Sequence, residues 1–216
     1  RNHGGRHDTG NGRLKQEIYM ADIFVIMGKS SSGKDTIFSR LVGQADCGLK
    51  TVTMYTTRPM RDGEADGREY FFTDEEHCAQ YEEQGRIVEL RAYNTVYGVW
   101  KYFTLDDGQI DMDSKETYII IGTLEAYDKI RNYYGKDRVH PIYIEVDAKT
   151  RIHRALARED SQKNPKYAEM CRRFLADEDD FSDDKIAALD IDIRFNNDDL
   201  DRCIDKIRAY IADVIN

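Results

Sequence analysis

The sequence predicts an α/β fold in three layers, in which helices cover both faces of a parallel core sheet. Its 216 residues are enough for one compact domain with small appended subdomains. An apolar run at residues 23–27 leads through a glycine-bounded loop into a helical pattern, and this order begins a βαβ fold. Strand and helix patterns then alternate along the second half of the chain. Because crossover helices join parallel strands, this alternation predicts a parallel sheet.

The first elements are a buried strand at 23–27, a loop, and a helix that ends at Gly43. Residues 49–104 differ from this pattern, since short runs of Thr, Tyr, Val and Phe alternate with glycine turns. One helix interrupts these runs: a capping-box pattern from Thr73 predicts its start, and Gly85 predicts its end. We therefore expect a small strand-rich insert within the α/β core.

The remaining segments continue the alternation of strands and helices. Short apolar runs predict buried strands, and apolar residues three and four positions apart predict helices. The expected strands are 118–121, 141–146 and 192–195, and the expected helices are 124–134, 148–159, 167–179 and 198–215. A polar break at 160–168 separates two of these helices.

The composition suits a soluble globular protein, with 40% hydrophobic and 34% charged residues. The net charge of −9 argues against nucleic-acid binding, which needs an excess of Lys and Arg. No apolar run approaches the ~20 residues of a membrane span, so we expect a cytoplasmic protein without a membrane partner, as a monomer or homodimer. The cysteines Cys47, Cys78, Cys171 and Cys203 lack metal-ligand spacing and are expected to be reduced thiols. Residues 1–19, which are polar and rich in glycine, are expected to be a disordered leader or an added extension.

A phosphate-binding loop is predicted at residues 28–34, whose sequence GKSSSGK fits the pattern G-x-x-x-x-G-K. Glycines at both ends let successive N–H groups point inward at phosphate oxygens, and the following helix directs its positive end to the same place. Lys34 supplies a cation for the β- and γ-phosphates of ATP. The predicted ATP contacts are Gly28, Lys29, Ser30, Ser31, Ser32, Gly33, Lys34, Asp35 and Thr36.

The residue after the loop lysine departs from the usual pattern. A Ser or Thr hydroxyl normally ligates Mg²⁺ at this position, whereas this chain has Asp35. A carboxylate is a suitable hard-oxygen ligand for Mg²⁺. We therefore expect a Mg²⁺ ion that arrives with ATP and is bound by Asp35.

A second candidate phosphate site lies at residues 56–72, which read TTRPMRDGEADGREYFF. The planar guanidinium groups of Arg58 and Arg61 can each grip a phosphate through two hydrogen bonds, and the Tyr70 hydroxyl can add a third contact. Taken alone, the segment also fits a solvated basic turn.

Together, the loop and this segment resemble the guanylate kinase family, whose pattern is T-T-R-x-P-R-x-G-E-x-x-G-x-x-Y-x-F. The segment matches nearly throughout, with its proline one position early, and the resemblance extends over about residues 20–216. It implies a P-loop kinase fold and an enzyme, a nucleoside-monophosphate kinase that uses ATP to phosphorylate GMP or dGMP. The residues that it implies for the GMP phosphate are Arg58, Arg61, Tyr70 and Tyr97.

The same resemblance assigns further roles. Glu89 corresponds to a glutamate whose carboxylate accepts two N–H donors of guanine. Asn197, in an N-D-D-L segment, corresponds to a residue near the adenine of ATP, with Arg154 beside the ATP phosphates. Arginines of the lid neutralise the transferring phosphate, and the resulting catalytic set is Lys34, Arg58, Arg158 and Arg173. The implied layout is a core at 20–52, 105–157 and 173–216, a GMP-binding insert at 53–104 and a lid at 158–172.

The chain departs from the family in two places near the guanine site. A serine that helps to read guanine is replaced by Met54 or Tyr55. The family's L-D-I-D becomes IIGT at residues 120–123, which removes two acidic residues and leaves Thr123 as the candidate GMP contact.

Two other functions fit parts of the pattern. Ribose 1,5-bisphosphate phosphokinases resemble guanylate kinases and can carry the G-K-D found at residues 33–35. Non-catalytic guanylate-kinase-like modules bind partner peptides, and they typically have a degraded phosphate loop. The whole of segment 56–72 and Glu89 favour GMP over the ribose bisphosphate. An intact Lys34 and the lid arginines favour an enzyme over a binding module.

Overall fold

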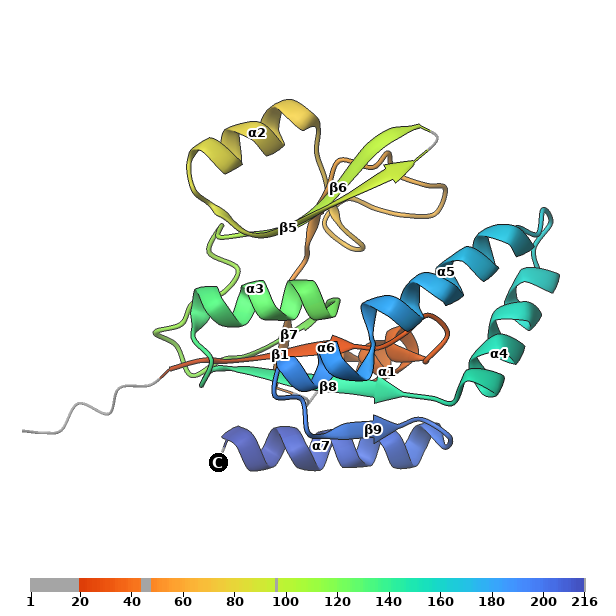
Figure 1. Cartoon of the computed structure of the whole chain (residues 1–216). Coiled ribbons are helices and arrows are strands. Elements are labelled where there is room, and N and C mark those ends of the chain that lie inside the picture. The colour runs from red at the N-terminus through yellow and green to blue at the C-terminus, as the bar shows by residue number, and fades with distance from the viewer. Residues whose placement is uncertain (1–19, 44–47, 96, 216) are drawn as a thin grey trace, which may run out of the picture.

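The computed structural model describes residues 20–43, 48–95 and 97–215, which form two β-sheets with helices around them (Figure 1). The leader expected at 1–19 and the thiol of Cys47 lie outside the described residues. The larger sheet has five strands in the order β2-β7-β1-β8-β9, with every pairing parallel. Its strands are β1 (Asp22–Met27), β2 (Leu49–Thr51), β7 (Thr117–Ile121), β8 (Val139–Glu145) and β9 (Arg194–Asn196). The predicted parallel core is confirmed.

Helices pack on both faces of this core sheet, because its central strand carries apolar side chains on both sides. Ile23 and Val25 of β1 face one layer, and Phe24 and Ile26 face the other. The helices on the first face are α3 (Leu124–Tyr134) and α6 (Asp183–Ala188), and those on the second are α1 (Lys34–Val42) and α7 (Leu200–Ile215). The result is the three-layer arrangement that the alternation of elements predicts (Figure 1).

The second sheet has four strands in the order β4-β3-β6-β5. They are β3 (Tyr55–Thr56), β4 (Phe71–Phe72), β5 (Ile87–Thr95) and β6 (Gly98–Leu105), and α2 (Glu75–Glu83) packs on them. The start of α2 corrects the sequence prediction. Its N-cap is Asp74, whose carboxylate accepts the His77 N–H at 2.8 Å. Thr73 precedes the helix because its own N–H donates to the Thr56 carbonyl and so extends the sheet.

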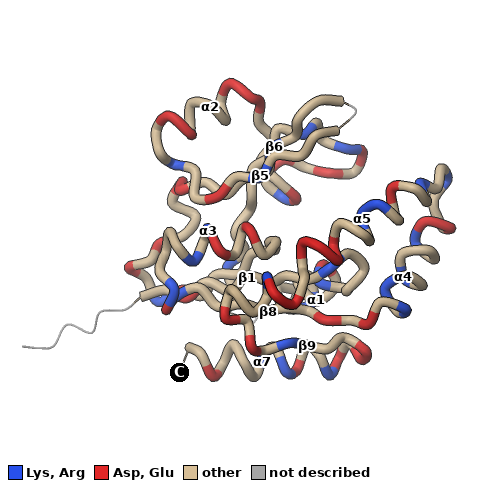
Figure 2. The backbone as a smooth tube through the Cα atoms, viewed as in Figure 1, with Lys and Arg blue, Asp and Glu red and all other residues tan. Residues whose placement is uncertain are grey.

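The helices α4 (Ala148–Asp160) and α5 (Tyr167–Asp180) form a hairpin that projects beside the second sheet (Figure 1). Acidic and basic residues are interspersed over both sheets and this hairpin (Figure 2). The short helix α6, which follows α5, was not predicted, since six residues with one buried side chain, Ile186, are too few for a periodic pattern. Across the described ranges, no helix is long and apolar enough to span a membrane.

Candidate active site

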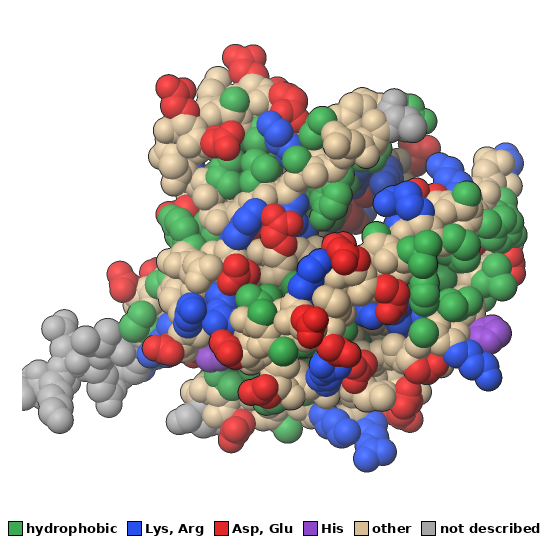
Figure 3. Space-filling model, viewed as in Figure 1, with side chains coloured by type: hydrophobic (Ala, Val, Ile, Leu, Met, Phe, Trp, Pro, Cys, Tyr) green, Lys and Arg blue, Asp and Glu red, His purple; other side chains and the backbone are tan. Residues whose placement is uncertain are grey.

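A cavity of about 750 Å³, here called the central cavity, lies between the loop after β1, the second sheet and α5. The surface is hollowed between the second sheet and the α4–α5 hairpin (Figure 3). The residues that line the cavity include Ser30, Lys34, Tyr70, Arg91, Tyr93, Trp100, Tyr102, Thr123, Arg172, Arg173, Asp177 and Asp180. It lies beyond the carboxyl ends of β1 and β7, where ligands bind in open α/β sheets.

The backbone of the phosphate-binding loop needs its two glycines. Gly33 has a φ of +87°, and a Cβ at this position would lie 2.5 Å from the Asn197 Nδ2 atom. A Cβ at Gly28 would lie 2.7 Å from the Ile144 carbonyl oxygen. Substituting either glycine would therefore displace the loop from the strand and helix that it joins.

Two residues predicted to bind ATP hold this loop from the C-terminal part of the chain. Asn197 donates from Nδ2 to the Ser32 carbonyl at 2.7 Å, and Arg154 donates to the Asn197 carbonyl at 3.0 Å. The hydroxyl oxygens of Ser31 and Ser32 are buried without a hydrogen-bond partner among the described residues. A buried hydroxyl without a partner is costly, and a phosphate oxygen is a suitable acceptor.

The lysines and one backbone N–H of the phosphate-binding loop contact carboxylates in this structure. Lys34, at the start of α1, has its Nζ 3.7 Å from the Asp35 carboxylate, which is 77% exposed. The Ser30 N–H donates to the Asp177 carboxylate at 2.7 Å, and Lys29 pairs with Glu178 at 2.8 Å. Two carboxylates at the end of α5 thus contact groups that the motif directs at phosphate. Thr36 is exposed on α1.

Arg151, on α4, is a site residue that sequence reasoning missed. Its guanidinium is buried, donates from Nε to the Ser30 carbonyl at 3.1 Å and pairs with Glu178 at 2.7 Å. It also lies over the Phe174 ring, 4.6 Å from the ring centroid. Arg151 therefore joins the loop to both hairpin helices. The available signal was its spacing of three from Arg154 on one helix face.

The first arginine of segment 56–72 has a partner within the same segment. Arg58 is buried and donates two parallel hydrogen bonds to Glu64, at 2.9 and 2.8 Å. This pairing, with an N–H from Arg61, lowers the pKa of Glu64 to about 2. Arg58 also lies over the ring of Tyr70, which lines the central cavity. The Arg61 side chain is exposed.

The predicted base-reading residue has no free carboxylate oxygen directed at the cavity. Glu89 is 2% exposed and accepts hydrogen bonds from Arg91 at 2.9 and 3.1 Å and from the Thr104 hydroxyl at 3.0 Å. Arg91 lines the central cavity, whereas Glu89 does not. Arg91 also contacts the Met54 sulfur at 3.4 Å. Glu89 therefore lies behind Arg91 as seen from the cavity, and its role in reading the base stays a prediction.

The remaining predicted residues are spread around the cavity. Arg173 lines it and lies 3.6 Å from Glu159, while Arg158 is exposed on α4 and does not line it. Arg172, which was not predicted, also lines the cavity. Tyr97, on the β5–β6 hairpin, is 81% exposed and does not line the cavity, but its ring stacks on Trp100, which does.

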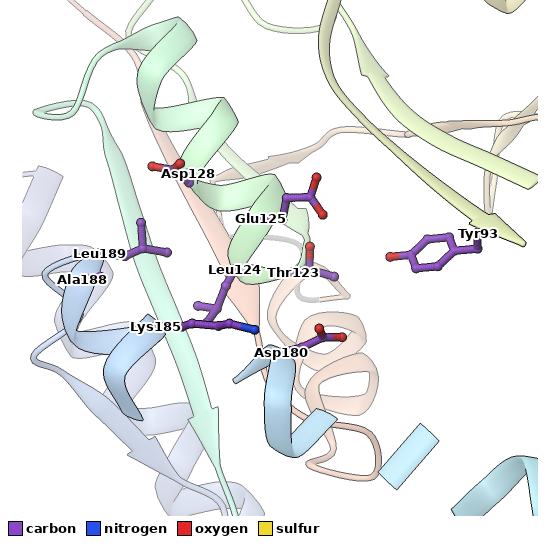
Figure 4. Close-up of a pocket in the computed structure, with 9 residues that line it drawn as sticks. All are labelled: Tyr93, Thr123, Leu124, Glu125, Asp128, Asp180, Lys185, Ala188 and Leu189. Carbon is purple, nitrogen blue, oxygen red and sulfur yellow. The ribbon is translucent and has the colours of Figure 1, made fainter. Parts of the chain in front are cut away.

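A smaller cavity of about 420 Å³ adjoins the central one and shares Tyr93, Thr123 and Asp180 with it. The Tyr93 ring lies across a gap from Thr123, Glu125 and Asp180 (Figure 4). Burial raises the pKa of Asp180 above its ordinary value. The Thr123 hydroxyl caps α3 by accepting the Ala126 N–H at 3.2 Å, and its own proton remains available to a ligand.

The family model, the curated relatives and the solved structure that match this chain are all guanylate kinases. The family model described as guanylate kinase matches residues 20–214. The guanylate kinase of Porphyromonas gingivalis is 29% identical over 199 residues, which cover 91% of this chain and 99% of that protein. That of Caldanaerobacter subterraneus subsp. tengcongensis is 28% identical over 194 residues, or 88% and 85% of the two chains. The crystal structure of guanylate kinase from Anaplasma phagocytophilum matches with a TM-score of 0.59 at 19% identity, over 90% of this chain and 86% of that one, and shows the shared fold.

Proposed function

The chain belongs to the guanylate kinase family, and we propose that it transfers the γ-phosphoryl group of ATP to GMP or dGMP. An oxygen of the GMP phosphate bonds to the γ-phosphorus, the bond from that phosphorus to the β–γ bridging oxygen breaks, and GDP and ADP are the products. The observation that supports this proposal is the central cavity. Lys34 of the phosphate loop lines it together with Arg91 and aromatic side chains of the second sheet.

The donor half of the proposed site is the phosphate loop. Its N–H groups and Lys34 bind the ATP phosphates, and the unpartnered hydroxyls of Ser31 and Ser32 support an anion there. For this to happen, the Asp177 carboxylate must leave the Ser30 N–H that it now occupies. A hinge movement of the α4–α5 hairpin, within the proposed lid at 158–172, provides a route for that release.

The acceptor half is assigned to the insert at 53–104. We assign the GMP phosphate to Arg58, Arg61, Tyr70 and Tyr97. Tyr70 lines the central cavity, and Arg58 lies against the Tyr70 ring. Because Glu64 holds the Arg58 guanidinium, the GMP phosphate must share or replace that partner.

The charge that develops during transfer is assigned to cations from both halves. Lys34 and Arg173 already line the cavity, whereas Arg158 must approach it from the exposed side of α4. Such cations act by position and charge, since the protein supplies no covalent chemistry in this reaction.

Mg²⁺ is proposed to enter with ATP. The residues fit such an ion: Asp35 offers an exposed carboxylate next to Lys34, and the described ranges hold no cluster of three or more His, Cys, Asp or Glu that would form a separate metal site. Mg²⁺ is commonly bound through one carboxylate and the substrate phosphates. When bound, the ion offsets negative charge on the phosphates.

The test is an ADP-release assay with ATP·Mg²⁺ and a panel of acceptors: GMP, dGMP, AMP, UMP, CMP and ribose 1,5-bisphosphate. We expect turnover with GMP and dGMP, and little with the other four. Turnover with ribose 1,5-bisphosphate alone would replace the proposed acceptor. ATP binding without turnover of any acceptor would indicate a binding module.

A further inference from the structure

The α4–α5 hairpin exposes a group of apolar side chains. Ile152 and Leu156 of α4 are 43% and 39% exposed, and Tyr167 and Leu175 of α5 are 46% and 69% exposed. The exposed thiol of Cys171 lies four positions from each of the two α5 residues. Hydrophobic side chains gather over this hairpin in the space-filling view (Figure 3). We call these five residues the outer face, and a grouped apolar surface of this kind indicates a contact site.

Helix geometry places the outer-face residues on one side of the hairpin. Arg151 of α4 and Phe174 of α5 face each other, with the guanidinium 4.6 Å from the ring centroid. Ile152 and Leu175 come one position later on their helices, which is about 100° around each axis. Because the two helices run antiparallel, this rotation leads to the same side of the hairpin. The other outer-face residues lie four or eight positions from these two and share that side.

The outer face points away from the central cavity. The α5 residues that line the cavity include Glu169, Arg172 and Ala176, whereas the outer-face residues do not line it. A partner on the outer face therefore leaves the proposed active site open.

Charged residues flank the outer face in a self-complementary order. On α4, the exposed Lys149 precedes the apolar residues and the exposed Asp160 follows them. On α5, the exposed Lys166 precedes them, and Asp179 follows them. The Asp179 carboxylate pairs with Lys185 but is 81% exposed. Each helix thus carries a positive group at the start of the face and a negative group at its end.

A second copy of the chain matches this order when two outer faces pack antiparallel about a two-fold axis. In such a contact, residue i meets residue j of the partner, and j meets i. With the axis midway between Ile152 and Leu156, Ile152 meets the partner's Leu156. The same axis places Lys149 opposite the partner's Asp160, since these two lie three and four positions outside the apolar pair.

One axis can serve both helices, because their midpoints lie side by side. Near the start of α4, Arg151 pairs with Glu178 at 2.7 Å. Near its end, Glu159 accepts the Lys166 N–H at 3.1 Å. The middle of α4 therefore lies beside the middle of α5.

On α5, the midpoint of the outer face lies between Cys171 and Leu175. About the same axis, Leu175 meets the partner's Cys171. Lys166 approaches the partner's Asp179. Both helices therefore bring apolar groups together at the centre of the contact and opposite charges together at its ends.

We propose that the outer face of the α4–α5 hairpin is a homodimer interface, on which a second copy of this chain packs antiparallel. Each helix is about 20 Å long and two adjacent helices are about 20 Å wide, so the contact covers roughly 400 Å² on each copy. A stable complex of standard size buries about 800 Å² on each partner. The dimer is therefore weak and reversible, with a dissociation constant of about 10 to 100 μM.

The first test is sedimentation velocity of the full chain between about 1 and 500 μM, where we expect a shift from monomer to dimer. Leu175→Glu places a carboxylate at the centre of the contact and should weaken the dimer by about tenfold or more. The fold should persist, because the side chain is 69% exposed in one copy. The matched control is Ile193→Glu, since Ile193 is 47% exposed but lies outside the hairpin.

The second test concerns the charges, at low salt. Lys149→Glu and Asp160→Lys each place like charges opposite one another twice in a homodimer, so each should weaken it by about tenfold. An equal mixture of the two variants restores opposite charges at both positions, and the mixed dimer should regain the original strength. Circular dichroism checks that both variants fold. A mixture that associates no better than the separate variants would overturn the antiparallel interface.

Three other outcomes would overturn the proposal. They are a monomer at every concentration, a dimer that Leu175→Glu leaves unchanged, and a monomer in which the Cys171 thiol is protected from maleimide, which would indicate a cover within the same chain. Cys171→Ser identifies the reacting thiol. The ADP-release assay separates these failures from failure of the proposed function. Activity per subunit should stay unchanged in Leu175→Glu, because the outer face does not line the cavity.

Discussion

The phosphate loop and the insert at 53–104 both carry candidate phosphate-binding groups in and beside the central cavity, but these groups contact their carboxylate partners differently. Lys29 and the Ser30 N–H meet carboxylates of α5 that lie 149 and 147 residues away in the sequence. In the insert, Arg58 pairs with Glu64 between β3 and β4, six residues away, and Arg91 pairs with Glu89 on β5, two residues away. The loop is therefore paired through the tertiary fold, and the insert through its own segments.

The phosphate motif and the arginine motif therefore contribute differently to the stability of the fold. The loop depends on backbone shape, and Lys34 has its one carboxylate contact in the described ranges at 3.7 Å. The arginines of the insert are buried and also hold their segments together. Substitutions in the loop should therefore affect activity more than stability, and those in the insert should affect both.

The largest effect is expected for Lys34→Met. Loss of this cation removes charge stabilisation from the transferring phosphate, so kcat/KM should fall by roughly 100- to 1,000-fold. The midpoint of thermal unfolding should change little, because the one ion pair of this side chain with a described residue is the long contact with Asp35. Steady-state kinetics and a melting curve measure the two quantities. A fall below tenfold would remove Lys34 from the catalytic set.

Arg58→Met should destabilise the protein where Lys34→Met does not. The variant leaves Glu64 without its buried partner, and the free energy of unfolding should fall by about 3 kcal/mol, the lower end for such pairs because Glu64 is partly exposed. Urea denaturation measures this change. Equal stabilities for the Arg58 and Lys34 variants would contradict the contrast between the two regions.

Asp177→Asn tests the carboxylate that accepts a hydrogen bond from the Ser30 N–H of the phosphate loop. Loss of the charge removes a competitor of phosphate at the Ser30 N–H, so ATP should bind a few-fold more tightly. Asp179→Asn is the matched control, since Asp179 lies on the same helix but pairs with Lys185. Calorimetric titration with ATP compares the three proteins. Weaker ATP binding in the Asp177 variant alone would show that this carboxylate assists the nucleotide.

Asp35→Ser tests the proposed magnesium ligand. The serine restores the residue type usual at this position, and the loss of a carboxylate should raise the Mg²⁺ concentration needed for half-maximal rate. The measurement is a Mg²⁺ titration of the rate at fixed ATP. An unchanged Mg²⁺ dependence would count against Asp35 as a ligand.

The smallest effect is a pH dependence in the insert. The pKa of Glu64 in the folded protein, about 2, lies below its ordinary value of 4.5, so the unfolded chain binds the proton more readily. The stability that Glu64 contributes is therefore present above about pH 4.5 and is lost as the pH falls toward 2. In denaturation series, the stability difference between the unaltered protein and Glu64→Gln should shrink over this range. A constant difference would exclude the Arg58–Glu64 pair as its source.

Local patterns in the sequence predicted most of the fold. The limits expected for the third helix, 124–134, match α3, and the other predicted helices and strands of the core differ by a few residues at their ends, whereas β2 of the core sheet was not predicted as a core strand. The exceptions have local causes. Helix α6 is too short to show a period, and the Asp74 cap depends on a backbone bond between Thr73 and the sheet.

The site was less predictable than the fold. The glycines and Lys34 could be placed from sequence because a G-x-x-x-x-G-K loop fixes its own backbone. The roles of Arg58, Glu89 and Arg158 could not be predicted in this way. A motif does not specify which carboxylate pairs with a guanidinium group, or which face of a helix lines a cavity. Arg151 was missed for the same reason.

By itself, the sequence determined the order of strands and helices, the phosphate loop and the resemblance to one enzyme family. These features depend on residues that are close in the chain, where periodicity and backbone geometry act directly. Only the tertiary structure decided that Arg91 stands between Glu89 and the cavity, and that Asp177 of α5 reaches the Ser30 N–H. Such contacts follow from how the sheets and the hairpin pack, because a charged group binds the partner that burial leaves within reach.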